Sequence, residues 1–238
     1  VRYAMERKIT VPAGYVRQLL KLVEEQGYSV DELLNYVGID SGIIDTQTEF
    51  PADKFGLLYQ RIYYIAQDEY FGMLSGGKVP NGTFRMMCHC LIHCKTLEHA
   101  IYRASDFHEI YRGTQVKPFL VRKGRYAKVS FTTTDASGMA LDELLQDSTP
   151  EKIRTSLSMW HHFLCWLIGT RLDLKAAYLS FPEPEDISLF KTVFQSEVKF
   201  DQHDNAIVFP AKYLDYPIVQ TPDTLRSFLK TAPYQLIV

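Results

Sequence analysis

Apolar residues recur every three or four positions along the first part of the chain, and this spacing predicts amphipathic helices. The first helix is expected between Pro12 and Gly27, with Val16, Leu19, Leu20 and Val23 on its apolar face. Ser29 is placed to cap a shorter second helix, which Gly38 closes. Together they predict a compact helical unit.

A longer helix is predicted after Pro51, a residue that suits the first turn of a helix. Its buried face is expected to comprise Phe55, Leu58, Tyr59, Ile62 and Ile65. A break rich in glycine and proline follows at 76–82. We therefore expect a helical portion over residues 1–80 and a different portion over 81–238.

Two further helices are predicted on either side of the Lys95 to Thr96 junction. The first runs from Thr83 to Cys94, and Thr96 is placed to cap the second, which ends before Gly113. The apolar face of the second helix is expected to contain Leu97, Ile101, Ala104, Phe107 and Ile110.

After Gly113 the apolar pattern changes to period two, which predicts a β-hairpin with one buried face. Residues 123–125 form its turn. The buried face is expected to contain Phe119 and Val121 on the first strand and Val129 and Phe131 on the second.

The last third of the chain predicts a long helix capped by Thr149 and ended by Gly169, with Trp160 on its apolar stripe. A strand at 176–181, a short helix near 187–194, a hairpin of 198–200 with 206–209 and a final helix after Thr221 follow. The pattern as a whole predicts an α+β protein, with a helical N-terminal portion followed by a mixed or antiparallel sheet and packed helices.

Composition limits the classes of function. The chain has 238 residues, 46% of them hydrophobic, which allows one large core or two small ones. Its 26 basic and 28 acidic side chains give no general positive charge, so DNA phosphates are not expected to bind it directly. Four cysteines without a disulfide pattern, no signal peptide and no membrane-spanning run predict a cytoplasmic protein that makes no membrane contact.

One short segment contains side chains that metals favour. His89 and His93 are four residues apart on the predicted helix, as are Cys90 and Cys94, so the four could reach one ion. Structural zinc sites, however, draw their ligands from separated segments. We therefore expect no metal here, and packing or the polar lining of a ligand cavity competes with a thiol or metal switch as the role of these residues.

Aromatic and basic side chains supply other candidates for a ligand pocket. Trp160 is expected to pack in the core and could also wall a cavity, whereas His161 and His162 are expected at the surface or its edge. Arg85 and Arg112 could meet a carboxylate. The sequence has no glycine-rich phosphate loop, nucleophile elbow or paired-histidine motif, so neither catalytic residues nor a cofactor are predicted.

Two stretches resemble the effector-binding half of AraC-type transcription regulators of the arabinose-binding-domain-like class. One runs from Pro80 to Cys88 and continues with Thr96, Leu97, Ala100 and Phe107. The other is the block from Phe190 to Pro217. The resemblance implies a sensor domain that is followed, in the family, by two helix-turn-helix units. Residues after Thr221 predict one helix and a tail, so we expect the DNA-binding half to be absent.

The resemblance leads us to expect a regulatory domain that binds a small organic effector between its helical first half and its sheet. It would form a homodimer and reach DNA only through the missing C-terminal domain. The residues that we expect to bind the ligand are Arg85, His89, Cys90, His93, Phe131, Trp160 and Tyr178. A metal or thiol redox sensor built on Cys90, Cys94, His89 and His93, a stand-alone small-molecule-binding protein and an enzyme remain alternatives.

Overall fold

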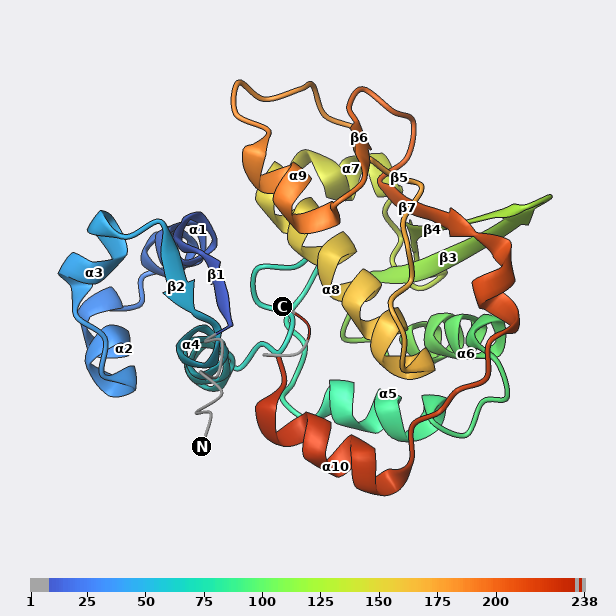
Figure 1. Cartoon of the computed structure of the whole chain (residues 1–238), viewed down its shortest axis with the longest axis horizontal. Helices are drawn as coiled ribbons and strands as arrows, with labels where there is room; N and C mark the ends of the chain where they lie inside the picture. The colour runs from blue at the N-terminus through green and yellow to red at the C-terminus, as the bar shows by residue number, and fades with distance from the viewer. Residues whose placement is uncertain (1–8, 234–235, 237–238) are drawn as a thin grey trace, which may run out of the picture.

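The computed structural model describes residues 9–233 and residue 236, and it shows an α+β fold in two parts (Figure 1). The N-terminal part is mainly helical, and the second part carries the large sheet. The predicted fold class is therefore confirmed. Helix α8 runs through the middle of the molecule, with the N-terminal part on one side and the sheet on the other.

From residue 9 onward, where the structure describes the chain, the N-terminal part contains four helices and a two-stranded antiparallel sheet. Its elements are β1 (Thr10–Pro12), α1 (Ala13–Glu25), α2 (Val30–Val37), α3 (Ser41–Thr46), β2 (Glu49–Pro51) and α4 (Ala52–Ala66). The Ser29 hydroxyl accepts a hydrogen bond from the Glu32 amide, and Gly38 is left-handed, so both ends of α2 are as predicted. The two strands and α3 were not predicted, because segments this short show no apolar period.

The second part consists of a five-stranded sheet and the helices around it. Its elements are α5 (Thr83–Leu91), α6 (Leu97–Ile110), β3 (Val116–Lys123), β4 (Tyr126–Thr133), α7 (Leu141–Gln146), α8 (Pro150–Ile168), β5 (Ala176–Tyr178), α9 (Ser188–Phe194), β6 (Glu197–Lys199), β7 (Ala206–Pro210), the 3₁₀ helix η1 (Ala211–Asp215) and α10 (Pro222–Thr231). The strand order is β3-β4-β7-β5-β6. Only β5 and β6 run parallel, so the sheet is mixed.

The hairpin of β3 and β4 forms as predicted, but β3 presents the opposite face to the core. Leu120 pairs with Val129 in the antiparallel register, and Leu120 is buried. Phe119 pairs with Ser130, and its side chain is 49% exposed. Because paired residues lie on the same side of a sheet, the buried Val129 places Leu120, and not Phe119, in the core.

The predicted hairpin between 198–200 and 206–209 is wrong, because β5 lies between β6 and β7. The loop between β6 and β7 crosses β5 and is tied to it by a side chain. Asn205 accepts a hydrogen bond from the Ser180 amide and donates one to the Ser180 hydroxyl. These bonds give hydrogen-bond partners both to the Ser180 backbone amide and to the buried side-chain amide of Asn205.

Helix α6 differs from its predicted face at one turn. Ile110 is 81% exposed, and His108 is buried in its place with 2% exposure. Thr96 caps the helix as predicted, since its hydroxyl accepts a hydrogen bond from the His99 amide. The apolar spacing predicted that Ile110 would be buried. It did not predict a buried His108, which is possible because both ring nitrogens have hydrogen-bond partners.

Helix α8 is buried along most of its length. Thr149 accepts a hydrogen bond from the Lys152 amide, Pro150 occupies the first turn, and Gly169 ends the helix in a left-handed conformation. His161 is buried rather than at the surface, and its Nε2 donates to the Leu172 carbonyl at 2.7 Å. No helix in the described part of the chain is long and apolar enough to cross a membrane.

Candidate functional site

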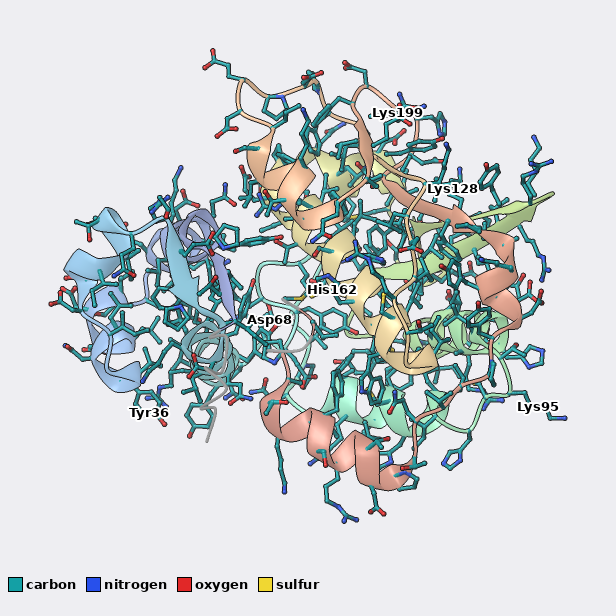
Figure 2. The ribbon with its side chains drawn as sticks, in the orientation of Figure 1. Tyr36, Asp68, Lys95, Lys128, His162 and Lys199 are labelled. Atoms are coloured by element: carbon teal, nitrogen blue, oxygen red, sulfur yellow. The ribbon has the colours of Figure 1, made fainter. Side chains whose placement is uncertain are left out.

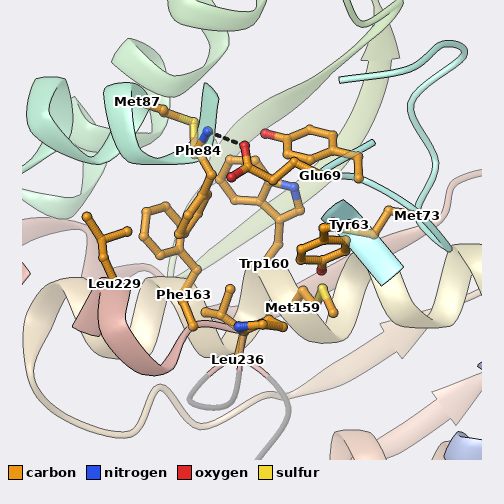
Figure 3. A pocket seen from close by; sticks show the side chains of 13 residues that line it. Tyr63, Glu69, Met73, Phe84, Met87, Met159, Trp160, Phe163, Leu229 and Leu236 are labelled. Atoms are coloured by element: carbon orange, nitrogen blue, oxygen red, sulfur yellow. Dashed lines mark hydrogen bonds between the residues drawn. The ribbon is translucent and has the colours of Figure 1, made fainter. Parts of the chain in front are cut away.

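A cavity of about 120 Å³ lies beside the middle of α8, and we call it the Trp160 cavity (Figure 3). Its lining comes from both parts of the fold. The lining residues are Tyr63, Glu69, Tyr70, Met73, Phe84, Met87, Met159, Trp160, Phe163, Leu229, Ala232, Pro233 and Leu236. Helices α4, α5, α8 and α10 all contribute, as do the segment between α4 and α5 and the segment after α10.

Helix α8 forms one wall through Met159, Trp160 and Phe163, which lie within one helical turn and therefore share a face. The Trp160 ring packs 5.9 Å from the Phe163 ring, centroid to centroid, and 5.9 Å from the His108 imidazole. These contacts fix the orientation of the indole at the cavity wall.

Glu69 is the one acidic side chain in the described lining, and it also caps α5. Its two carboxylate oxygens accept hydrogen bonds from the Gly82 amide at 3.1 Å and the Phe84 amide at 2.8 Å. Burial raises the pKa of Glu69, while these two amides and the charge of Arg85 act in the opposite direction. The carboxyl group is thus fixed in place, with lone pairs left over to accept from a ligand.

The segment that carries Glu69 is itself held by side chains. Asp68 accepts hydrogen bonds from the amides of Tyr70 and Val79, which folds the segment back on itself. The Tyr70 hydroxyl lies 2.9 Å from His108 Nε2, and His108 Nδ1 donates to the Ala104 carbonyl at 2.7 Å. Burial lowers the pKa of His108, so the imidazole is neutral and its Nε2 accepts a hydrogen bond from the Tyr70 hydroxyl.

The segment after α10 closes the cavity with Ala232, Pro233 and Leu236. Both parts of the fold hold it through backbone carbonyls. Gln60 Nε2 on α4 donates to the Ala232 carbonyl at 2.6 Å, and His162 Nδ1 on α8 donates to the Leu236 carbonyl at 2.7 Å. Figure 2 shows His162 in the middle of the molecule, whereas Lys95 and Lys199 lie at its edge.

The lining defines the chemistry that the Trp160 cavity can accept. Figure 3 shows Phe84, Phe163 and Leu229 at one side, and Tyr63, Met73 and Met159 at the other, with Glu69 above Trp160. No lysine, arginine or histidine belongs to the described lining, so a carboxylate or phosphate would find no counter-charge there. A ring or short apolar group with a donor for Glu69 fits these walls.

The residues proposed from sequence are not brought together by the fold. Trp160 lines the cavity, and Arg85 lies outside it, where its charge acts on Glu69. His89, Cys90 and His93 are exposed, because Met87, Cys88 and Leu91 form the buried face of this segment. Phe131 lies in the core on β4, and Tyr178 is half-buried on β5, neither of them in the cavity lining.

The cysteine and histidine segment lacks the geometry of a metal centre. Among residues 9–233 and 236, no group of three or more histidine, cysteine or acidic side chains is placed to hold an ion. Burial raises the pKa of Cys88 and of Cys94, so both are thiols at neutral pH. A protonated thiol is a poor nucleophile.

Most of the cavity could not be found from sequence. Tyr63 lies on the helix that was predicted after Pro51, but Glu69 and the segment after α10 gave no signal in the sequence. We expected the sheet to form the second wall. The described lining of the Trp160 cavity contains no strand residue, and helices and two loop segments form it instead.

Comparisons with known proteins place this architecture among ligand-binding regulatory domains. Residues 27–218 match the model of the family described as "Arabinose-binding domain of AraC transcription regulator, N-term". The chain therefore belongs to this family. A search of curated proteins finds no match.

One solved structure that resembles the chain is the transcriptional regulator CdpR from Pseudomonas aeruginosa. The two share 13% sequence identity, and the alignment has a TM-score of 0.42. It covers 96% of this chain and 62% of CdpR, so the chain spans less than two thirds of that protein.

Proposed function

We propose that this chain is the effector-binding regulatory domain of an AraC-type transcription regulator, and that the Trp160 cavity is its effector site. The observation that carries the proposal is that α4, α8 and the segment after α10 meet at one cavity. We propose further that residues 1–80 and 81–238 act as one regulatory unit, that the unit is a cytoplasmic homodimer, and that DNA is contacted only by a separate domain.

The position of the C-terminal segment supports a regulatory role for the cavity. A ligand can shift an equilibrium only if it binds two states with different affinity. Because Leu229, Ala232 and Leu236 form part of the wall, their displacement would change the contacts of a bound molecule. Occupancy of the cavity would therefore favour one position of the segment after α10.

The effector that we propose is a small and mainly apolar molecule, neutral or cationic, with a hydrogen-bond donor for Glu69. Aromatic rings of Tyr63, Phe84 and Trp160 suit a ring or an organic cation. A cavity of about 150 Å³ in another protein holds benzene. The 120 Å³ found here thus sets the size of the buried group at one ring or less.

Fluorescence of Trp160 provides the test. The chain has two tryptophans, and Trp166→Phe leaves Trp160 as the only indole. Ligands from a panel of small aromatic and aliphatic amines, alcohols and carboxylic acids should change its emission, with the amines and alcohols binding more tightly than matched acids. Binding of none of these compounds, or a preference for the acids, would contradict the proposal.

A blocking variant separates binding in the cavity from binding elsewhere. Met73 is half-buried at the cavity wall, so Met73→Phe, which adds no second indole, should narrow the space with little damage to the core and reduce the response. Met139→Phe is the matched control, because Met139 is exposed and does not line the cavity. Hydrogen exchange at the Ala232 amide, which bonds to the Phe228 carbonyl, should slow on ligand binding.

A further inference from the structure

A region lined by a buried arginine lies at the start of α8, separate from the Trp160 cavity. Arg154 is 2% exposed and is among the largest fully buried side chains of the described residues. Its guanidinium lies 4.7 Å from the centroid of the Tyr15 ring and 5.5 Å from that of Phe190. The cation is thus held between the N-terminal part and α9.

The hydrogen bonds of Arg154 go to neutral groups. Its Nη2 donates to the Gln18 side-chain oxygen at 2.6 Å, and the Tyr15 hydroxyl bonds to both Arg154 and Ser158. The Nε donor is buried and has no hydrogen-bond partner. Among the ion pairs of the described residues, none includes Arg154.

An unpaired buried cation is an unusual arrangement with a high desolvation cost. Buried charges in proteins are normally paired, and a guanidinium cannot lose its proton to escape the cost as a lysine can. Cation–π contacts and an amide oxygen compensate only part of it. The Nε donor therefore still lacks an acceptor, which an anion would supply.

A cleft of about 280 Å³ reaches this arginine, and we call it the Arg154 cleft. Its lining residues are Tyr15, Gln18, Leu19, Lys21, Leu22, Glu25, Tyr59, Gly72, Thr149, Glu151, Lys152, Arg154 and Thr155. Lys21 forms an ion pair with Glu25 at 3.8 Å, which leaves Lys152 and Arg154 facing one carboxylate, Glu151, in the lining. The first turn of α8 adds the positive end of a helix dipole.

We propose that the Arg154 cleft binds a small oxyanion, either a carboxylate group of an organic molecule or inorganic phosphate. The anion replaces the Gln18 oxygen at Nη2 and accepts from Nε, so that one planar fork holds two of its oxygens. The Tyr15 hydroxyl is beside the guanidinium and can donate to the same group. This site does not depend on the effector site proposed above.

The direct test compares anions at equal ionic strength. Thermal unfolding is measured in sodium chloride, sodium acetate and sodium phosphate, with the wild-type chain and with Arg154→Met. Acetate or phosphate should raise the melting temperature of the wild type above its value in chloride, and the increase should be lost in Arg154→Met. Response to acetate identifies a carboxylate site, and response to phosphate alone identifies a phosphate site.

A second variant supplies the counter-charge from within the chain and does not remove the arginine. Gln18→Glu places a carboxylate at the atom that now accepts from Nη2, so it should raise the melting temperature in chloride and abolish the response to acetate and phosphate. Gln47→Glu is the matched control, because Gln47 is exposed at the end of α3. This control should leave the anion response unchanged.

Three results would overturn the proposal. The first is a wild-type melting temperature that is the same in all three salts. The second is an anion effect of equal size in the wild type, Arg154→Met and Gln18→Glu, because this would be a general salt effect on stability. The third is a Gln18→Glu variant less stable than Gln47→Glu, since a cation without a counter-ion must gain from a carboxylate at this distance.

Discussion

The Trp160 cavity and the Arg154 cleft lie along the same helix, but they differ in how the charged group of each is hydrogen-bonded. In the cavity, both oxygens of Glu69 accept hydrogen bonds from backbone amides. In the cleft, Arg154 has a buried donor without a partner and no acidic partner among the described residues. The comparison teaches that Glu69 is held in place by the fold before any ligand is bound, whereas Arg154 keeps a buried donor for which the described residues supply no acceptor.

The largest effect is expected at Trp160, because its side chain belongs to the core as well as to the cavity. Trp160→Ala removes ring contacts with His108 and Phe163 and should lower the free energy of unfolding by about 3 to 5 kcal/mol. Chemical denaturation measures this change. The control is Tyr64→Ala on the exposed face of α4, and a loss at Trp160 no larger than this control would show that the indole is not part of the core.

A smaller loss is expected at the helix start that borders the cleft. Thr149→Ala removes the side-chain acceptor of the Lys152 amide and should lower the free energy of unfolding by about 1 kcal/mol. Thr170→Ala, at the exposed other end of α8, should have no comparable effect. An equal loss of unfolding free energy in the two variants would show that the Thr149 cap contributes no more to stability than an exposed threonine does.

Arg154→Met tests the comparison most directly. The methionine keeps most of the apolar contacts and removes the unpaired charge, so in chloride the free energy of unfolding should change by less than about 1 kcal/mol or increase. Chemical denaturation in chloride and in acetate measures it. A loss in chloride as large as that of Trp160→Ala would show that the guanidinium is satisfied by its neutral neighbours.

The smallest effect concerns the pH dependence of Glu69. Because burial raises its pKa in the folded state, the folded protein holds this proton more tightly than the unfolded chain, and the contribution of Glu69 to stability falls as the pH rises above its ordinary pKa of about 4.3. The Glu69→Gln variant has no such ionisable group, so its stability should not show this decrease with pH. The difference in unfolding free energy should therefore move in favour of Glu69→Gln between pH 4 and pH 7, and a shift in the other direction would contradict the raised pKa.

Local signals in the sequence predicted most helices, because capping chemistry involves residues only a few positions apart. Thr96, Thr149 and Thr221 all cap the helices that were expected after them. Strand order was not predictable in this way. The placement of β5 between β6 and β7 brings together residues that are far apart in the sequence, such as Asn205 and Ser180, which are 25 residues apart.

The candidate sites were harder to predict for the same reason. Trp160 was found because a tryptophan on an apolar stripe is visible in the sequence, whereas Glu69 and Leu236 meet it only through tertiary packing. Arg154 gave no signal, since nothing in its neighbourhood in the sequence indicates that the fold buries it. A charged residue within an amphipathic helix is normally expected at the surface.

The bonds that hold the segment after α10 separate attachment from selectivity. Gln60 and His162 donate hydrogen bonds to the carbonyls of Ala232 and Leu236, and the side chains of Ala232 and Leu236 line the cavity. Every amino acid has a backbone carbonyl, so the side chains at positions 232 and 236 can be substituted while the hydrogen bonds from Gln60 and His162 are kept. In related sequences, substitutions at these two positions could therefore change which ligand the Trp160 cavity prefers, while the segment keeps its position.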